Sequence, residues 1–256
     1  MSYFAARSAP LGAVPAEVVT AMFYNFAPER VAKALPAAWQ FAGPEAALRA
    51  RLDSAVAALR RYGAGANENV GVAAELAGKA ARGAPLEGRP LFAANLALPW
   101  PDEPLAALWH AVTLLREHRG DGHVAVLVAA GVSGRESNVL HTAAGRVTRD
   151  FMARGRDYDE AAWSHYEQRL AARGLLDEDG SLTAAGRELK DRIELDTDRL
   201  ALSALDALSD TEVETLFQAL TPITRAVVDG GDVPAVTPMG VRRDELHDGS
   251  AHLAGS

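Results

Sequence analysis

The sequence predicts a mainly α-helical protein with one small β-hairpin in its C-terminal half. Apolar residues recur at helical spacing over long stretches, and one such series is Leu48, Leu52, Val56 and Leu59. This spacing places the side chains on one face of an α-helix. Residues 175–183 contain an Asp-Gly turn between leucines, which is typical of two short strands joined by a tight turn.

A length of 256 residues is enough for two domains that each bury a core. We expect an N-terminal helical domain over residues 1–104, a second domain with long C-terminal helices over 105–230, and an extended tail over 231–256. The tail contains Gly, Pro and Asp and few periodic apolar residues, which is typical of segments without a core. The first boundary follows a connector with five prolines: Pro85, Pro90, Pro99, Pro101 and Pro104.

In the N-terminal domain we expect helices over 15–22, 28–35 and 44–62. A helix of small residues ending near Ala81 and a short helix before residue 104 follow. Pro28 and Pro44 suit the first positions of two of these helices, because the missing N–H of proline has no partner there anyway. The opening residues resemble the interior of a domain, so we expect that further residues precede them.

The C-terminal half has clearer helix signals. Leucines and a valine at helical spacing predict a helix that begins at Leu105 and ends at Gly120, after which Asp121 caps a second, apolar helix over 124–130. Two capping boxes open later helices. They are Ser133–Glu136, before a helix to 144, and Ser209–Glu212, before a helix to 228.

The segment RLAARGLLDEDGSLTAAGREL, residues 169–189, predicts a winged helix. Its first residues belong to the end of a predicted recognition-type helix over 159–172. A short strand, a turn and a second strand follow. Thr183 then caps a long helix over 184–205.

Several motifs together resemble a bacterial group of MarR-like helix-turn-helix proteins. They are FYNFAPERVAKALPAAW, PLFAANLALPWP, LWHAVTLLREHRGDGHVAVLVAAG and the hairpin segment RGLLDEDGSLTAAGREL, and they cover nearly the whole chain. The resemblance implies an α-helical domain joined to a MarR-like winged-helix domain with a small β-wing. It implies no activity, because a fold alone does not fix function.

The composition excludes several classes of protein. Cysteine is absent, so no disulfide, iron–sulfur cluster or thiolate metal site can form. No window reaches the roughly 18 uninterrupted apolar residues of a membrane span, and no secretory signal is visible in the opening residues. We therefore expect a cytoplasmic protein without a membrane partner. The net charge of −8 disfavours nucleic-acid binding, since duplex binders concentrate positive charge.

DNA is one candidate partner, and the predicted recognition helix would carry the contacts. The residues assigned to them are His165, Gln168, Arg169 and Arg173. Three carboxylates at the hairpin tip, within 177–179, would repel phosphate. A basic run ahead of the helix, from Arg146 to Arg156, offsets this in part. We expect DNA binding to be weakened or lost, with a DNA-binding regulator as an alternative.

A small organic ligand bound between the domains is the favoured prediction, with the long C-terminal helices pairing two subunits as a homodimer. Aromatic, basic and imidazole side chains in one helix and its neighbours would bind the ligand. They are Tyr24, Asn25, Trp109, Arg116, Arg119 and His141. The competing interpretation of the N-terminal aromatic residues is that they form a packed core.

The alternative is an enzyme without a cofactor that hydrolyses a small organic substrate or opens its ring. His110 or His123 would act as the base and Glu117 as the acid. The competing structural interpretation is an ion-pair network with Asp121 as a helix cap, in a purely structural or partner-binding module. His110, His118, His123 and His141 lack a recognised metal spacing, and no P-loop follows the Gly-rich segments, so we expect no metal and no cofactor.

Overall fold

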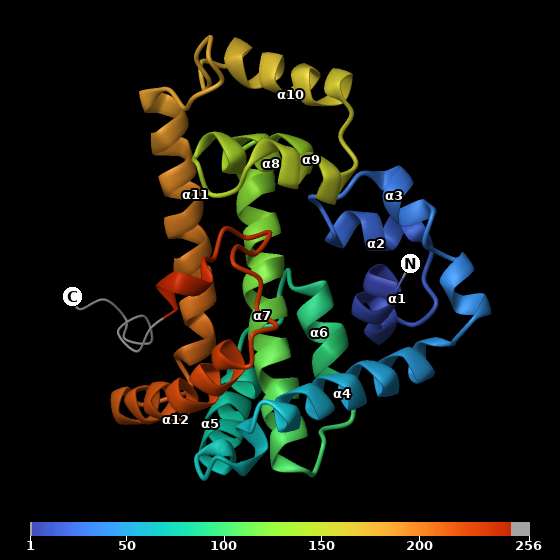
Figure 1. The fold of residues 1–256 in the computed structure, drawn as a ribbon, viewed down its shortest axis with the longest axis vertical. Helices are drawn as coiled ribbons and strands as arrows, with labels where there is room; N and C mark the ends of the chain where they lie inside the picture. Colours follow the sequence, from blue (N-terminus) through green and yellow to red (C-terminus); the bar gives the residue numbers. More distant parts are fainter. Residues whose placement is uncertain (1, 247–256) are drawn as a thin grey trace.

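The structure is a computed structural model that describes residues 2–246. Helices dominate these residues, and Figure 1 shows their arrangement. The α-helices are α1 (Ser2–Ser8), α2 (Ala16–Met22), α3 (Pro28–Ala32), α4 (Pro44–Arg61), α5 (Val70–Gly83), α6 (Pro90–Leu96), α7 (Pro104–Ala129), α8 (Gly134–Ala143), α9 (Arg149–Arg156), α10 (Glu160–Ala172), α11 (Ala184–Leu202) and α12 (Asp210–Asp229). Short 3-10 helices are η1 (Ala9–Leu11), η2 (Ala37–Gln40), η3 (Ala64–Ala66), η4 (Ser203–Leu205) and η5 (Arg243–Glu245).

Helix α7 is continuous over 26 residues, so the predicted end at Gly120 is wrong. The guanidinium of Arg89 lies against Gly122, where an added Cβ would be 2.5 Å from Nη1. The glycine therefore makes room for a neighbouring side chain and does not end the helix. The predicted capping of a following helix by Asp121 is also wrong. Its carboxylate accepts a hydrogen bond from the amide of Phe92 at 2.8 Å and so caps α6.

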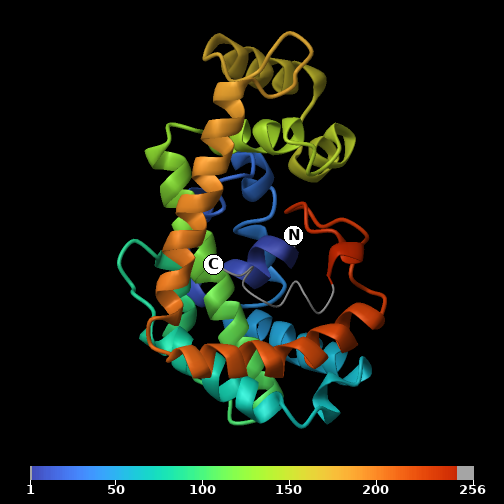
Figure 2. The same cartoon turned by 90° about the vertical axis from the view of Figure 1, so that its left-hand side faces the viewer.

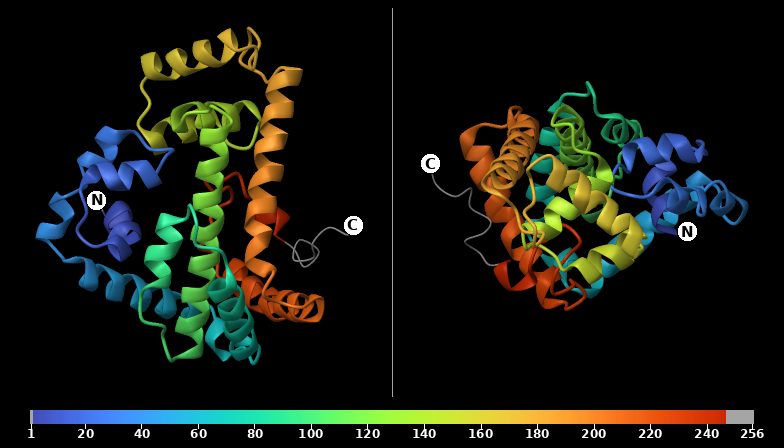
Figure 3. Two further views of the ribbon diagram at one scale, coloured as in Figure 1. Left: turned by 180° about the vertical axis from the view of Figure 1, so that it is seen from behind. Right: turned by 90° about the horizontal axis from the view of Figure 1, so that it is seen from above.

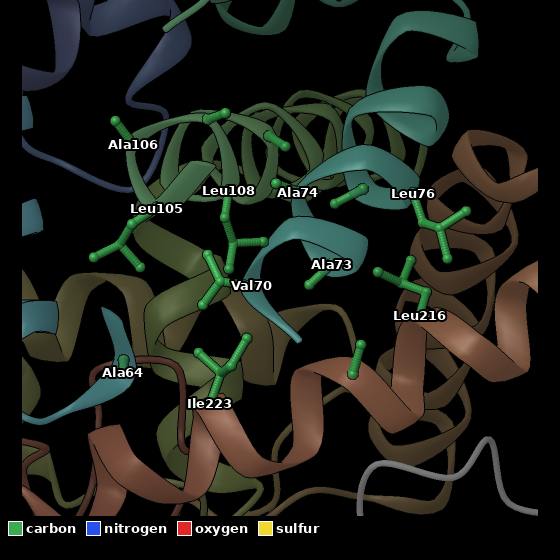
Figure 4. Packing of buried hydrophobic residues seen from close by; sticks show 14 of the residues in the cluster. Ala64, Val70, Ala73, Ala74, Leu76, Leu105, Ala106, Leu108, Leu216 and Ile223 are labelled. Carbon is green, nitrogen blue, oxygen red and sulfur yellow. The ribbon is translucent and has the colours of Figure 1, made fainter. Parts of the chain in front are cut away.

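One end of α7 packs into a core with α5 and α12, which Figure 4 shows from close by. Many contact residues are small, and Ala73, Ala77 and Ala111 are fully buried. Small side chains let helix backbones approach closely, so larger residues such as Leu216 and Ile223 of α12 fill the remaining space.

The other end of α7 belongs to a second core, formed with α8 to α11. Trp163 of α10 is 2% exposed and Leu170 is fully buried, and both anchor the inner face of that helix. Helix α9 precedes α10 across a short turn in which Asp157 has a φ of 54°. This two-helix unit lies at the end of the molecule opposite α12 (Figure 1). Helix α9 was not predicted, since it has only two turns and buries only Met152.

The predicted β-wing is reduced to one antiparallel bridge between Leu176 and Leu182. The amide of Asp177 donates to Ser181 O at 3.0 Å, and the amide of Thr183 donates to Leu175 O at 3.2 Å. No strand longer than such a bridge occurs among residues 2–246. The hairpin is present, but its arms are too short for the strands that we expected.

Three of the caps predicted from sequence are confirmed. Ser133 and Ser209 each form a complete capping box, at the start of α8 and of α12. The Thr183 side chain accepts from the amide of Gly186 at 3.0 Å and caps α11. These motifs are local in sequence, so their geometry does not depend on distant packing.

The N-terminal aromatic residues form a core of their own and pack on the start of α8. The rings of Phe4 and Phe26 meet edge to face with centroids 4.9 Å apart, and Phe23 joins them. A Cβ on Gly134 would lie 1.7 Å from the carbonyl oxygen of Tyr24. The absence of a side chain at Gly134 therefore lets the N-terminal segment contact α8 directly.

The predicted extended tail turns back on the molecule. Residues 236–242 form a hairpin-like turn in which Val236 and Arg242 make an antiparallel bridge. Val236 packs on the second core, and Gly240 lies beside His141. The part of the tail beyond residue 246 lies outside the described residues. No helix within 2–246 is long and apolar enough to cross a membrane.

Candidate nucleic-acid interface and neighbouring polar clusters

Helix α10 has an exposed outer face that no other element covers in the view from above (Figure 3). Asp159 begins the helix by accepting a hydrogen bond from the amide of Ala162 at 2.7 Å. Because Trp163 and Leu170 bury the inner face, His165 and Gln168 lie on the exposed side. Helices of DNA-binding modules enter the major groove with such a face.

Arg169 and Arg173, also predicted to contact DNA, reach back toward α8. The Nε of Arg169 lies 3.1 Å from a carboxylate oxygen of Glu136, and Nη1 of Arg173 lies 3.6 Å from the same oxygen. Burial alone would raise the pKa of Glu136, but hydrogen bonds from Ser133 and Arg169 outweigh it and lower the pKa. The two arginines therefore hold α10 to α8 while their side chains stay 54% and 36% exposed.

The hairpin tip keeps its negative charge. The amide of Ser181 donates to Asp177 at 3.0 Å and to Asp179 at 2.9 Å. Hydrogen bonds from Ser181 and Asp177 lower the pKa of Asp179 to about 2, while the hydrogen bond with Asp179 raises that of Asp177. Glu178 is exposed beside them. Three carboxylates therefore lie together at the hairpin tip, next to α10 in the sequence.

The basic run offers less free positive charge than the sequence indicates. Arg149 pairs with Glu160 at 2.8 Å, and Arg30 of α3 pairs with Asp157. Arg154 has no ion-pair partner among residues 2–246. Residues 131–183 contain seven arginines and nine acidic residues. Attraction for phosphate is therefore confined to a few positions around α9.

Three of the predicted ligand or catalytic residues lie beside Arg7 and Arg51, near the start of the chain: Trp109, Arg116 and Glu117. Glu117 is 2% exposed and binds Arg7 at 2.5 Å and Arg116 at 2.6 Å. Arg51 stacks on the ring of Trp109 at 5.0 Å. A carboxylate held by two guanidiniums fits the ion-pair interpretation.

His110 faces a different neighbour from Glu117. Its ring meets Trp100 edge to face with centroids 4.8 Å apart. Burial and then the charge of Arg51 lower the pKa of His110. His110 and His123 are about 20 Å apart along α7 at 1.5 Å per residue, so the three predicted catalytic side chains share no common space.

A second group lies between α7, α8 and α11. Arg119 pairs with Asp198 at 2.9 Å, and Nδ1 of His123 lies 2.9 Å from Oγ1 of Thr197. Burial, followed by the charge of Lys190, lowers the pKa of His141 to about 4. Burial also lowers the pKa of His123. The imidazole of His141 is therefore neutral at pH 7.

Tyr24 and Asn25 form a third group, at the start of α8. The hydroxyl of Tyr24 donates to Val132 O at 2.9 Å, and Nδ2 of Asn25 donates to Oγ of Ser137 at 3.2 Å. They join the N-terminal segment to α8 and do not face Trp109. The predicted ligand site is thus divided among three clusters, and the roles assigned to its residues stay predictions.

Sequence reasoning missed the arginines that connect distant helices. Arg89 is 6% exposed, and its guanidinium donates to the carbonyl oxygens of His118 in α7 and of Leu200 in α11. Nothing in the local sequence distinguishes such an arginine from a surface one. Among residues 2–246, no group of three or more His, Cys, Asp or Glu is arranged to hold a metal ion.

A protein family matches most of the chain. A comparison with curated proteins and one with solved structures found no match. The model of a helix-turn-helix family matches residues 1–234, which is most of the chain. The chain therefore belongs to this helix-turn-helix family.

Proposed function

We propose that this protein is a DNA-binding regulator of the MarR-like winged-helix type that contacts the major groove with α10 and binds DNA weakly. The observation that carries the proposal is the exposed outer face of α10, opposite the face anchored by Trp163 and Leu170. Membership of a helix-turn-helix family supports it. The single bridge between Leu176 and Leu182 serves as a short wing.

Two side chains on α10 have the chemistry to contact bases. Gln168 can donate and accept at once, as pairing with adenine requires, and His165 can contact a base or a phosphate. Ala161 and Ala172 lie on the same exposed side and leave space for the groove. Arg169 and Arg173 would contact phosphate from one flank while they stay bound to Glu136.

Weak affinity follows from the charges around this face. Phosphate contacts supply most of the non-specific affinity for duplex DNA through the release of counterions. Here Glu160 neutralises Arg149, and Glu178 lies with two aspartates at the hairpin tip. We propose that specificity comes from the base contacts of α10, with little help from the phosphates.

The test selects duplexes from a randomised pool and measures binding by fluorescence anisotropy at low and at physiological salt. The double variant His165→Ala/Gln168→Ala should lose about tenfold or more in affinity for the selected sequence, since each good base contact contributes about 1–3 kcal/mol. Gln218→Ala, on the exposed side of α12, is the matched control and should bind as the parent does. No enrichment of any sequence, or equal affinity of the double variant, would refute the proposal.

We also propose a homodimer paired through α11. Leu195 and Leu202 are 50% and 47% exposed and lie seven residues apart, so they share one side of the helix. Two copies would present two α10 helices, as a palindromic site requires. Light scattering should give twice 27.1 kDa for the parent and 27.1 kDa for Leu195→Asp/Leu202→Asp. Val72→Asp on α5 is the control, and a monomeric parent would contradict the dimer.

A small organic molecule is proposed to control this DNA contact. The residues that sequence analysis assigned to it lie in three separate clusters, so the ligand is not assigned to them. Support comes from a hollow beside α9, lined in part by Phe151 and Arg154. Helix α9 immediately precedes α10, so a molecule bound there would act on the DNA-contacting helix through the turn that joins the two helices.

A further inference from the structure

A hollow of about 320 Å³ lies between α9 and the C-terminal turn. Figure 2 shows this turn, in red, approaching the underside of α9. Five consecutive or nearly consecutive residues of α9 line the hollow on one side, and Pro238 lines it on the other. The volume lies within the range of pockets that bind small organic molecules, about 300–1,000 Å³.

The walls are largely apolar. Phe151 is 41% exposed, which is high for a phenylalanine, and Met152 and Pro238 add apolar surface. Gly155 also lines the hollow, and a Cβ added there would meet no atom within 4 Å. The space beside Gly155 is therefore open to a ligand with a flat or elongated apolar body.

The Arg154 guanidinium at the hollow has no carboxylate partner among residues 2–246. Arg154 is exposed, and no ion pair or hydrogen bond of its side chain occurs there. Arg156 also lines the hollow, but its guanidinium stacks on the ring of Phe26 at 4.0 Å, and its Nε is buried where a ligand in the hollow would not reach it. Arg154 is therefore the cation that an anionic ligand in the hollow can reach.

We infer that this hollow binds an amphipathic organic anion, with its apolar body against Phe151 and Pro238 and its carboxylate or sulfonate at Arg154. The anion would supply the acceptor that the Arg154 guanidinium lacks. It would also join α9 to the C-terminal turn and so fix the position of α10. Only this effect on DNA binding rests on the proposed function, whereas the site itself does not.

The first test measures binding of 1-anilinonaphthalene-8-sulfonate, a fluorescent aromatic anion, to the full chain without DNA. Gly155→Leu places a side chain in the hollow and should weaken binding about tenfold or more. Gly71→Leu on α5 is the matched control, since its Cβ also meets nothing within 4 Å and the position is exposed. The control should bind the dye as the parent does, and equal affinity of all three proteins would overturn the site.

The second test asks whether the anionic group is recognised. Arg154→Gln should weaken binding of the sulfonate several-fold and leave binding of the uncharged N-phenyl-1-naphthylamine unchanged. An equal loss for both dyes would show that the apolar walls alone bind, which would overturn the assignment of an anion. Circular dichroism and the melting temperature of each variant establish that the fold is kept.

A third measurement separates this inference from the proposed function. Anisotropy with the selected duplex is repeated with saturating sulfonate, and the dissociation constant should change in the parent and stay constant in Gly155→Leu. Site-specific dye binding without any DNA binding would support the ligand site and refute the regulator. DNA binding with a dye response that Gly155→Leu does not alter would refute the ligand site and leave the regulator intact.

Discussion

The Nε of Arg169 in α10 lies 3.1 Å from the buried carboxylate of Glu136, at the start of α8. The same carboxylate accepts a hydrogen bond from the amide of Ser133 at 2.8 Å and so completes the capping box. The Glu136 side chain thus caps the start of α8 and also holds α10, the candidate DNA-contacting helix, in its orientation. The geometry of α10 therefore depends on a buried residue of a neighbouring helix.

Replacement of Glu136 by Gln should lower the free energy of unfolding by about 1–3 kcal/mol, because a charge-assisted hydrogen bond in a buried place is lost. Urea denaturation measures this loss. Glu188→Gln, which breaks the exposed pair with Arg192, is the control and should cost less than about 1 kcal/mol. Similar losses in both variants would contradict a special role for Glu136.

The contribution of Glu136 should also depend on pH. Its pKa is lowered in the folded state, so the stabilisation is present above the unfolded pKa of about 4.3 and is lost as pH falls through the folded pKa. The difference in stability between the parent and Glu136→Gln should therefore shrink in acid. A difference that stays constant from neutral pH to acid pH would contradict this assignment.

Asp121 should have the opposite pH dependence. Burial raises its pKa to about 6, so the folded state favours the protonated form. The parent should lose about 2–3 kcal/mol relative to Asp121→Asn between pH 4 and pH 7, at about 1.4 kcal/mol per pKa unit. Asparagine keeps an acceptor for the amide of Phe92. Urea denaturation of both proteins at the two pH values measures the change. A stability difference between the two proteins that is the same at pH 4 and at pH 7 would refute the prediction.

Gly134→Ala should destabilise the contact between the N-terminal segment and α8. The added Cβ would lie 1.7 Å from the carbonyl oxygen of Tyr24, so one of the two backbones must move. We expect a loss of about 1–3 kcal/mol, as for overpacking in a core, seen as a lower melting temperature. Gly71→Ala meets no atom within 4 Å and should stabilise α5 slightly. A melting temperature of Gly134→Ala equal to the parent's would contradict the contact.

Glu178→Lys should raise the affinity for DNA if the hairpin lies next to phosphates. The change removes a repelling carboxylate and adds a phosphate contact, which should steepen the dependence on log salt by about one. Glu75→Lys changes the net charge equally at an exposed position of α5 and should have a much smaller effect. Anisotropy titrations at several salt concentrations measure both variants. An equal gain in both would show that only net charge matters.

Local features of the fold could be predicted from sequence because a few neighbouring residues determine them. The capping boxes at Ser133 and Ser209 and the cap at Thr183 are confirmed. The predicted helix end at Gly120 was wrong because a glycine within a helix can make room for a residue that is distant in the sequence. Arg89 occupies the space beside Gly122, and the start of α6 uses the carboxylate of Asp121.

The candidate sites were harder to predict, because which side chains meet depends on long-range packing. Glu117 was predicted to act with histidines of its own helix, yet its partner is Arg7, 110 residues away. Tyr24 was placed near Trp109 but bonds to Val132. Sequence spacing orders residues along one helix and does not show which distant segment lies against each face.

The course of α7 through both cores has a consequence for how the chain melts. Leu108 near one end and Leu127 near the other belong to different cores on a single rod of 26 residues. Neither core can unfold without loss of part of α7, the helix on which the other core packs. Calorimetry should therefore show one cooperative heat-absorption peak. By the same coupling, a substitution that destabilises the core at the α10 end of this rod should also destabilise the alanine-rich core at its other end.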